Sequence, residues 1–270
     1  LDWLEDTWLL EADATFMERV VFPAIHDNYQ YFAESPITEP SVPLDYGNTN
    51  FLNVYGDWIF LEYLSEHFGG PEISRTIWTY LDGRANHPDQ YSIQGVASFL
   101  HTKNTTLNKT FAGFALANRW ARKTYAIGSG FPKQKVVSPV TKSYSLGPGA
   151  TRKSGSWRIK HLASRWISFW PRSNASKHGH LRLGLALPPY SAARAVVINK
   201  SGTRSPRTIP LNGAGDGHLR LPFQRGTVQR IDLLLSNTSA RFVCWEATFY
   251  SCSGRPKDDR RMYHITASLN

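Results

Sequence analysis

The spacing of apolar residues changes near the middle of the chain, and the change predicts two kinds of structure. Up to about residue 125, apolar side chains recur at steps of three and four residues, the period of an amphipathic helix. After about residue 136, short segments alternate apolar and polar residues, the period of a half-buried strand. The sequence therefore predicts an α + β protein of two domains, an all-helical lobe followed by an all-β sandwich of jelly-roll type.

Pro and Gly residues divide the helical half into helices and loops. Pro23 is expected to end the first helix, and Gly69-Gly70 the third. Residues 33–50 are rich in Pro and polar side chains, so we expect a long loop that either lines a cleft or packs on the surface. The expected helices cover residues 7–22, 26–32, 52–68, 71–81, 89–101 and 107–125.

The segment Gly128-Ser-Gly-Phe-Pro132 is typical of a linker between domains. We accordingly expect a helical lobe at residues 1–127, a linker at 128–135 and a β-sandwich domain at 136–270. The expected strands cover residues 156–162, 166–170, 180–186, 195–198, 218–223, 228–235, 242–245 and 263–267.

Charge is distributed unevenly between the two halves. Residues 1–120 hold six Lys/Arg and sixteen Asp/Glu, whereas residues 121–270 hold twenty-five Lys/Arg and five Asp/Glu. A basic half can bind an anionic polymer, or it can be a solvated surface that pairs with its acidic neighbour. The basic residues are scattered along the sequence, so no specific nucleic-acid binding is expected. No run of eighteen apolar residues occurs, so no transmembrane segment is expected either.

The two cysteines, Cys244 and Cys252, lie eight residues apart among strand-like residues. A metal site needs more Cys or His ligands at tighter spacing. We expect a local disulfide between them, which implies an oxidising, secreted environment. Two free buried thiols are the alternative.

The helix expected at residues 7–22 carries two carboxylates, Glu11 and Glu18, on one stripe. Thr7 is its expected N-cap, and Glu5 and Asp6 are acids that suit a helix N-terminus. The stripe is either solvated or part of a site. The apolar face expected beside it consists of Leu10, Ala14, Met17 and Val21.

The letters of Trp8-Leu-Leu-Glu-Ala-Asp-Ala-Thr-Phe-Met-Glu18 resemble the second metal-site helix of gluzincin-type zinc metallopeptidases. Aminopeptidases of that clan have W-L-N-E-G-F-A-T-Y-F-E there, and the first Glu is the third zinc ligand. The resemblance implies that Glu11 is this ligand. Leu10 departs from the usual Asn, and Ala12-Asp13 departs from the usual Gly-Phe.

Two further residues acquire candidate roles from the same resemblance. Glu18 would orient a ligating His through a hydrogen bond, with a solvated carboxylate as the alternative. Tyr55 would stabilise the oxyanion of the substrate, with a tyrosine at the edge of the core as the alternative. The segment Tyr55–Glu66 and the two-part layout also look like secreted bacterial metallopeptidases.

The zinc site of the clan also needs H-E-x-x-H, which supplies two His ligands and a Glu as general base. That motif does not occur in these 270 residues. We therefore expect the chain to be the C-terminal portion of a secreted zinc metallopeptidase that hydrolyses peptides or proteins. The isolated chain is expected to be inactive and to hold no stoichiometric zinc.

A second interpretation is a secreted binding protein without catalysis. In that case the basic β-sandwich would recognise an anionic cell-surface polymer or a protein surface. Because β-sandwiches serve many functions, the fold alone does not decide between the two.

Overall fold

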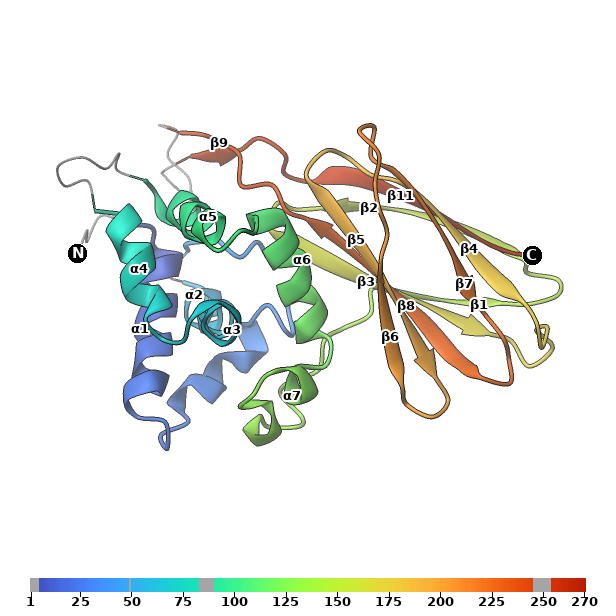
Figure 1. Cartoon of the computed structure of the whole chain (residues 1–270), viewed down its shortest axis with the longest axis horizontal. Coiled ribbons are helices and arrows are strands. Elements are labelled where there is room, and N and C mark those ends of the chain that lie inside the picture. The colour runs from blue at the N-terminus through green and yellow to red at the C-terminus, as the bar shows by residue number, and fades with distance from the viewer. Residues whose placement is uncertain (1–4, 49, 83–89, 245–253) are drawn as a thin grey trace. The chain divides into compact units, whose positions relative to one another are not determined.

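We describe a computed structural model of the chain, in which residues 5–48, 50–82, 90–244 and 254–270 are described (Figure 1). The chain forms two compact units. One, the helical unit, comprises Leu1–Ser138, His161–Ala163 and Ser239–Asp259. The other, the β unit, comprises Pro139–Lys160, Ser164–Thr238 and Arg260–Asn270. The domain boundaries expected at residues 127 and 136 stay a prediction.

The predicted order, a helical region followed by a β-sandwich of two sheets, is confirmed. No helix within the described ranges is long and apolar enough to cross a membrane. The helices are α1 (Thr7–Val21), α2 (Asn53–Gly56), α3 (Trp58–Phe68), α4 (Ile73–Tyr80), α5 (Ser92–Thr102), α6 (Leu107–Asn118) and α7 (Ala121–Thr124), with 3-10 helices η1 (Asp27–Glu34) and η2 (Gly128–Gly130).

Three of the expected helices have a different form, and the one expected at 107–125 is divided into α6 and α7. The segment expected as a short helix at 26–32 is the 3-10 helix η1. The single helix expected at 52–68 is divided into α2 and α3 at Asp57. Gly56 has a low helix propensity, and it directly precedes the division.

The buried face of α1 differs from the predicted one. Trp8, Ala12 and Phe16 are fully buried and Thr15 is nearly so, at steps of four, three and one residues. Ala14 and Val21, expected in the apolar face, are exposed, so that prediction is wrong. The large rings of Trp8 and Phe16 bury more area than the predicted aliphatic side chains could, and they decide which face turns inward. The remaining predicted members, Leu10 and Met17, are half-buried.

The acids before α1 serve another helix. The Ser92 amide, at the start of α5, donates to Glu5 Oε2 (2.9 Å), and the Ser92 hydroxyl donates to Glu5 Oε2 (2.8 Å) and Asp6 Oδ2 (2.7 Å). These carboxylates therefore satisfy the N-terminus of α5, where negative charge is favoured. The residue that precedes α1 as its N-cap is Asp6, so the expectation that Thr7 is the cap is wrong.

The loop expected at residues 33–50 contributes to the core of the helical unit. Ser35, Ile37, Leu44 and Asp45 are each at most 1% exposed. The Leu44 amide donates to the Leu162 carbonyl oxygen at 3.0 Å, which ties the loop to one of the distant stretches of this unit. The expected alternatives, a cleft wall or surface packing, do not describe these residues.

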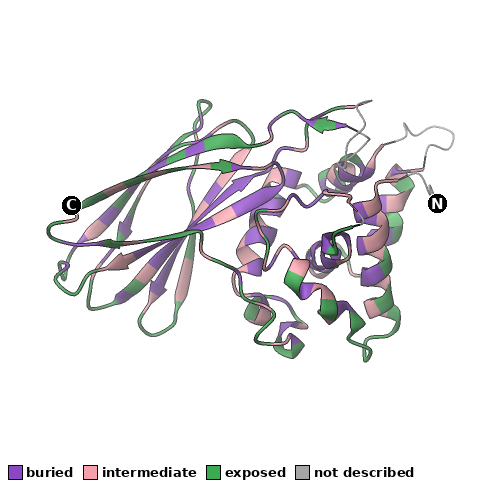
Figure 2. Ribbon diagram, turned by 180° about the vertical axis from the view of Figure 1, so that it is seen from behind, coloured by how far each residue is buried: buried purple, intermediate pink, exposed green. Residues whose placement is uncertain are grey.

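The β unit contains two sheets whose apolar faces form its core. Alternation of buried and exposed residues is visible along its strands (Figure 2). One sheet has the order β1-β3-β8-β5-β6 and the other β2-β11-β4-β7. The strands are β1 (Lys142–Leu146), β2 (Arg152–Ile159), β3 (Ala163–Pro171), β4 (His180–Ala186), β5 (Ser191–Asn199), β6 (Arg204–Thr208), β7 (Asp216–Pro222), β8 (Val228–Asn237) and β11 (Arg261–Leu269), while the short pair β9 (Phe242–Val243) and β10 (Arg255–Pro256) belongs to the helical unit.

Two edge strands, β1 and β6, were not predicted from the sequence. β6 contains Pro206 and has exposed or half-buried residues throughout, so it lacks an apolar alternation. Proline is tolerated there because an edge strand leaves one side without hydrogen bonds. β1 pairs in parallel with β3 and has one fully buried residue, Leu146.

Candidate active-site face of the helical unit

Glu11 and Glu18 lie on the same stripe of α1, as the sequence predicts. Glu11 is half-buried and Glu18 is exposed, and Glu11 precedes the buried Thr15 by about one turn. The stripe thus runs along the border between the buried face of α1 and solvent. A carboxylate in this position can reach a ligand without paying the full cost of burial.

Tyr55 is held against a second tyrosine that the sequence analysis did not single out. The rings of Tyr31, in η1, and Tyr55, in α2, stack with centroids 4.9 Å apart and planes 21° apart. Gly56 allows this approach, because a Cβ atom there would lie 2.7 Å from the Glu34 carbonyl oxygen. The two tyrosines are half-buried.

The acidic groups of α1 act electrostatically on this tyrosine pair. Burial raises the pKa of the Tyr31 hydroxyl, and the Asp27 carboxylate raises it further. Tyr55, Glu18 and Glu11 act in the same direction, so all three lie close enough to influence Tyr31. Tyr55 contacts Tyr31 directly, while the charges of Glu11 and Glu18 act on it through space, and we call Glu11, Glu18, Tyr31 and Tyr55 the tyrosine–glutamate face.

The departure of Asp13 from the Phe of the clan has a structural reason. Asp13 Oδ2 accepts hydrogen bonds from the Ser74 hydroxyl at 2.9 Å and from Trp78 Nε1 at 2.8 Å. Burial raises the pKa of Asp13, and these two donors oppose the rise. Asp13 thus attaches α1 to α4.

A buried ion pair joins the last turn of α1 to α3. Arg19 Nη2 lies 2.6 Å from Glu62 Oε1, and Glu62 is 1% exposed. Burial raises the pKa of Glu62 to about 7, Arg19 opposes the rise, and Glu66 adds to it. No local pattern predicts this pair, because Glu62 occurs within a long apolar run and its partner is 43 residues away.

A metal site cannot be completed from the described residues. No group of three or more His, Cys, Asp or Glu side chains lies close enough to hold an ion within residues 5–48, 50–82, 90–244 and 254–270. Of the donors that zinc prefers, the tyrosine–glutamate face offers carboxylates and no imidazole. It fits a zinc site only if two His ligands come from elsewhere.

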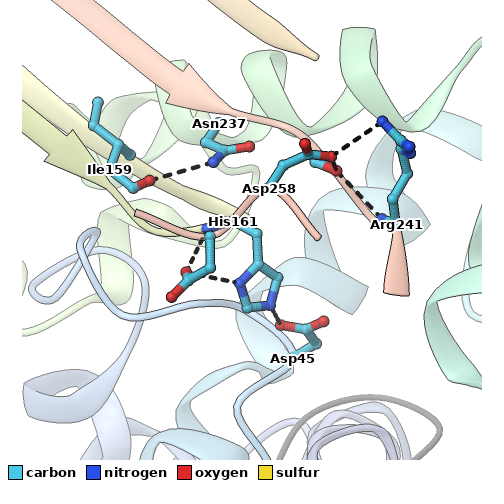
Figure 3. A network of polar contacts seen from close by, with 8 residues as sticks. Asp45, Ile159, His161, Asn237, Arg241 and Asp258 are labelled. Carbon is cyan, nitrogen blue, oxygen red and sulfur yellow. Dashed lines mark hydrogen bonds and ion pairs between the residues drawn. The ribbon is translucent and has the colours of Figure 1, made fainter. Parts of the chain in front are cut away.

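In a second cluster of titratable groups in the helical unit, His161 and Asp45 are buried and Asp259 is partly exposed. His161 Nε2 lies 2.8 Å from Asp45 Oδ1, and His161 Nδ1 lies 3.1 Å from Asp259 Oδ1 (Figure 3). Burial alone would lower the pKa of His161, but the two carboxylates outweigh it and raise the pKa to about 9. Because both ring nitrogens are bonded to carboxylates, His161 is a charged structural residue and has no nitrogen left for a metal or a proton transfer. Asp259 also accepts from the His161 amide at 3.1 Å.

Neighbouring polar contacts extend this cluster along residues 239–259. The Ser239 hydroxyl donates to Asp258 Oδ2 at 2.7 Å, and Arg241 Nη1 lies 3.5 Å from the same oxygen (Figure 3). Asp57, also buried, has its pKa raised well above the usual value by burial and by the charge of Asp45. Together these contacts hold the distant stretches of the helical unit in place.

The predicted disulfide falls partly on residues that are not described. Cys244 is half-buried and forms no disulfide with a described residue. Cys252 lies outside the described residues, so its pairing with Cys244 stays a prediction.

No protein-family model matches the sequence, and no curated protein matches it. Solved structures similar to its β-rich half include the pre-peptidase C-terminal domain of a collagenase from Bacillus anthracis, at 13% identity and a TM-score of 0.28, covering 49% of this chain and 97% of that one. Another is PliG of Salmonella Typhimurium, a periplasmic inhibitor of g-type lysozyme, at 13% identity and a TM-score of 0.28, covering 48% and 100%. A third is CorA, a surface-associated copper-binding protein of Methylomicrobium album BG8, at 8% identity and a TM-score of 0.30, covering 48% and 98%. We base the functional argument on the residues of this chain.

Proposed function

We propose that this chain is part of a secreted zinc-dependent metallopeptidase that hydrolyses peptide bonds of peptide or protein substrates. The observation that supports this most is the stack of Tyr55 on Tyr31, together with the through-space effect of the Glu11 and Glu18 charges on the Tyr31 hydroxyl. The metal-helix motif gives Glu11 and Glu18 their candidate roles independently of Tyr55. A common location for all three is what a single active site requires.

In this proposal each residue of the face has one task. The chemistry that a bound zinc ion would supply is Lewis acidity, which would activate a water molecule for attack on the peptide carbonyl. Glu11 contributes a carboxylate ligand, and Glu18 orients a ligating His by accepting its second N–H. Tyr55 donates a hydrogen bond to the carbonyl oxygen as negative charge develops on it. The two His ligands and the general base lie outside the described residues.

Tyr31 and Gly56 would act on the reaction through Tyr55. The stack with Tyr31 restricts rotation of the Tyr55 ring, and the close approach at Gly56 fixes the backbone that carries it. Preorganised donors of this kind contribute most when they need no rearrangement during the reaction. The β unit would bind the substrate or a cell-surface polymer.

The proposal can be tested with the full-length product of the reading frame that encodes this chain, assayed for casein hydrolysis. We expect Tyr55→Phe to lower kcat by about 100- to 1,000-fold while zinc stays bound, because one oxyanion donor is lost. Glu11→Gln is expected to abolish the activity together with the bound zinc. Glu72→Gln, which removes an exposed carboxylate at the start of α4, is the matched control and should change neither.

Activity that survives both substitutions at the Glu72→Gln level would contradict the proposal. Loss of activity in Tyr55→Phe accompanied by loss of zinc would contradict the role given to Tyr55. A shift of thermal stability in either variant must be measured alongside, because unfolding also removes activity.

The second candidate is a secreted binding protein without catalysis, and the distribution of charge favours it. The last 150 residues carry twenty-five Lys/Arg against five Asp/Glu. In this case the full-length product would hold no zinc and cleave no casein, yet would bind an anionic polymer. The two candidates therefore differ in zinc content before any variant is made.

A further inference from the structure

One face of the sheet β2-β11-β4-β7 is exposed and rich in arginine. The four strands alternate, with Leu181, Leu183 and Ile265 among the residues of the buried face. The opposite face carries Arg152, Arg182 and Arg220, which are all exposed. Exposed and buried positions alternate along these strands in Figure 2.

The register places these three arginines in one line across the whole sheet. Ser268 of β11 pairs with Arg152 of β2 on one side and with Arg182 of β4 on the other. Arg182 in turn pairs directly with Arg220 of β7. Neighbouring strands are about 4.8 Å apart, so the line spans about 14 Å. We call Arg152, Ser268, Arg182 and Arg220 the arginine row.

The arginine row is unfavourable for the sheet by itself. Like charges directly opposite each other on adjacent strands destabilise the pairing, and Arg182 and Arg220 are such a pair. None of the three arginines forms an ion pair with a residue in the described ranges. Arg220 Nη2 lies 3.1 Å from His180 Nδ1. The single acid of the four strands, Asp216, lies four residues from Arg220 near the other end of β7.

The row next to the arginine row consists of two hydroxyl-bearing residues, a glycine and a histidine. Thr266 pairs with Ser154 and Gly184, and Gly184 pairs with His218. Gly184 has no side chain, and the space that a Cβ would take there is occupied by Thr266 Oγ1 (2.7 Å) and the ring of His218 (3.6 Å), so these polar groups lie close together. The hydroxyls of Ser154 and Thr266 can donate hydrogen bonds to a ligand and accept them from it.

We propose that the arginine row and the hydroxyl-bearing row beside it form a binding surface for an anionic polysaccharide. Guanidinium groups bind carboxylate and sulfate in a bidentate manner, and a line of them suits a chain that bears such groups at intervals. The serine and threonine hydroxyls suit the hydroxyls of the sugars. The inference deepens the proposed binding role of the β unit, and it does not depend on peptidase activity.

The composition of the face favours a polysaccharide over single-stranded nucleic acid. Proteins that bind single strands stack the bases on aromatic side chains. Neither row contains Trp, Tyr or Phe. The four positions of the arginine row and the four beside it are instead Arg, Ser, Thr, Gly and His.

The test measures binding of the 270-residue chain to heparin, a sulfated polysaccharide, by isothermal titration at low salt. The variant Arg152→Thr/Arg182→Thr/Arg220→Thr removes the arginine row, and threonine is well accepted in strands. The control Lys142→Thr/Lys200→Thr/Arg207→Thr removes three exposed positive charges elsewhere in the β unit. Both variants have the same net charge, and circular dichroism checks that both are folded.

We expect the arginine-row variant to bind heparin at least about tenfold more weakly and with a shallower salt dependence, because released counterions drive such binding. The control should change the affinity by less than about threefold. Equal losses in the two variants, or no loss in either, would overturn the proposal, as would a wild-type chain that does not bind. A single-stranded DNA that binds as tightly as heparin through the same arginines would overturn the choice of polysaccharide.

Because heparin binding requires neither zinc nor Glu11, its outcome is separate from that of the peptidase test. A chain that binds heparin through the arginine row while the full-length product lacks zinc and activity would uphold this inference alone. The reverse result would uphold the peptidase alone.

Discussion

The two surfaces with candidate functions are assembled from the chain in opposite ways. The tyrosine–glutamate face of the helical unit takes its members from residues 11–55, and its charges are acidic. The arginine row of the β unit combines residues 152, 182, 220 and 268, and its charges are basic. Helix periodicity brings together the two carboxylates of the first surface, and strand register brings together the residues of the second.

Residues that lie together on one helix can be predicted from the sequence, whereas residues that lie together across a sheet cannot. Residues seven positions apart on a helix lie on the same side of it, so Glu11 and Glu18 can be placed together from the sequence alone. Residues on four strands share a line only when the register is known. Scattered basic residues in the sequence therefore became an ordered line only in the structure.

The His161 cluster is an exception to the rule that sites in the helical unit are local in sequence. It lies in the helical unit but is assembled from distant residues. We expect His161→Ala to destabilise the protein by about 3–5 kcal/mol, since it removes the positive charge that the buried Asp45 and the partly exposed Asp259 both contact. Urea denaturation measures the change. His264→Ala, an exposed histidine of β11, is the control and should cost less than about 0.5 kcal/mol. Similar small costs for both would show that the helical unit does not depend on the cluster.

The same cluster predicts the pH dependence of stability. The pKa of His161 is raised from 6.5 to about 9 in the folded protein. Its contribution is therefore fully present below pH 6.5 and is lost as pH rises through about 9. The loss amounts to about 3 kcal/mol. Denaturation midpoints between pH 6 and pH 10 measure it, and His161→Gln should flatten this part of the profile. A wild-type stability that increases from pH 6 to pH 10 would contradict the raised pKa of His161.

The tyrosine–glutamate face can be loosened without touching its functional groups. Gly56→Ala places a Cβ 2.7 Å from the Glu34 carbonyl oxygen, so α2 must shift away from η1. We expect a cost of about 1–3 kcal/mol from overpacking. Gly226→Ala, where no atom lies within 4 Å of the new Cβ, is the matched control. Thermal unfolding of both variants measures the two changes in stability. Equal changes would show that the approach of Gly56 to Glu34 is not tight.

The arginine row predicts the smallest effect, with the opposite sign. Arg182→Thr removes one partner of the Arg182–Arg220 pair, and we expect stability to rise by about 0.2–1 kcal/mol at low salt. The gain should shrink at high salt, because exposed charges are screened. A decrease in stability at low salt would indicate that a negative charge already balances the charge of Arg182. The argument that the arginine row awaits an anionic ligand would then fail.

The fold was predictable to the extent that its signals were local. The change of period near residue 130 predicts helices followed by strands, and the observed order agrees. The inward face of α1 was not predictable from periodicity alone, because two overlapping stripes were apolar and the rings of Trp8 and Phe16 decided between them. The edge strand β6 was not predicted, because its residues lack an apolar alternation and include Pro206.

The candidate site was predictable only in part. Glu11, Glu18 and Tyr55 came from a motif, but Tyr31 has no motif and is identified by its stack with Tyr55. Likewise, Glu5 and Asp6 were expected to serve the helix that follows them, whereas they hold Ser92 at the start of α5. The partners of His161 lie 116 and 98 residues away in sequence, and no local pattern links them.

The most direct test of the account is the zinc content of the full-length product with and without Glu11. Elemental analysis of the wild type and of Glu11→Gln and Glu72→Gln compares a proposed ligand with a matched carboxylate. We expect one zinc ion per chain in the wild type and in Glu72→Gln. In Glu11→Gln we expect the zinc affinity to fall by more than about 10- to 100-fold, which is the weakening caused by loss of a residue that only hydrogen-bonds to a ligand. Full zinc content in Glu11→Gln, or none in the wild type, would contradict the proposal that Glu11 is a metal ligand.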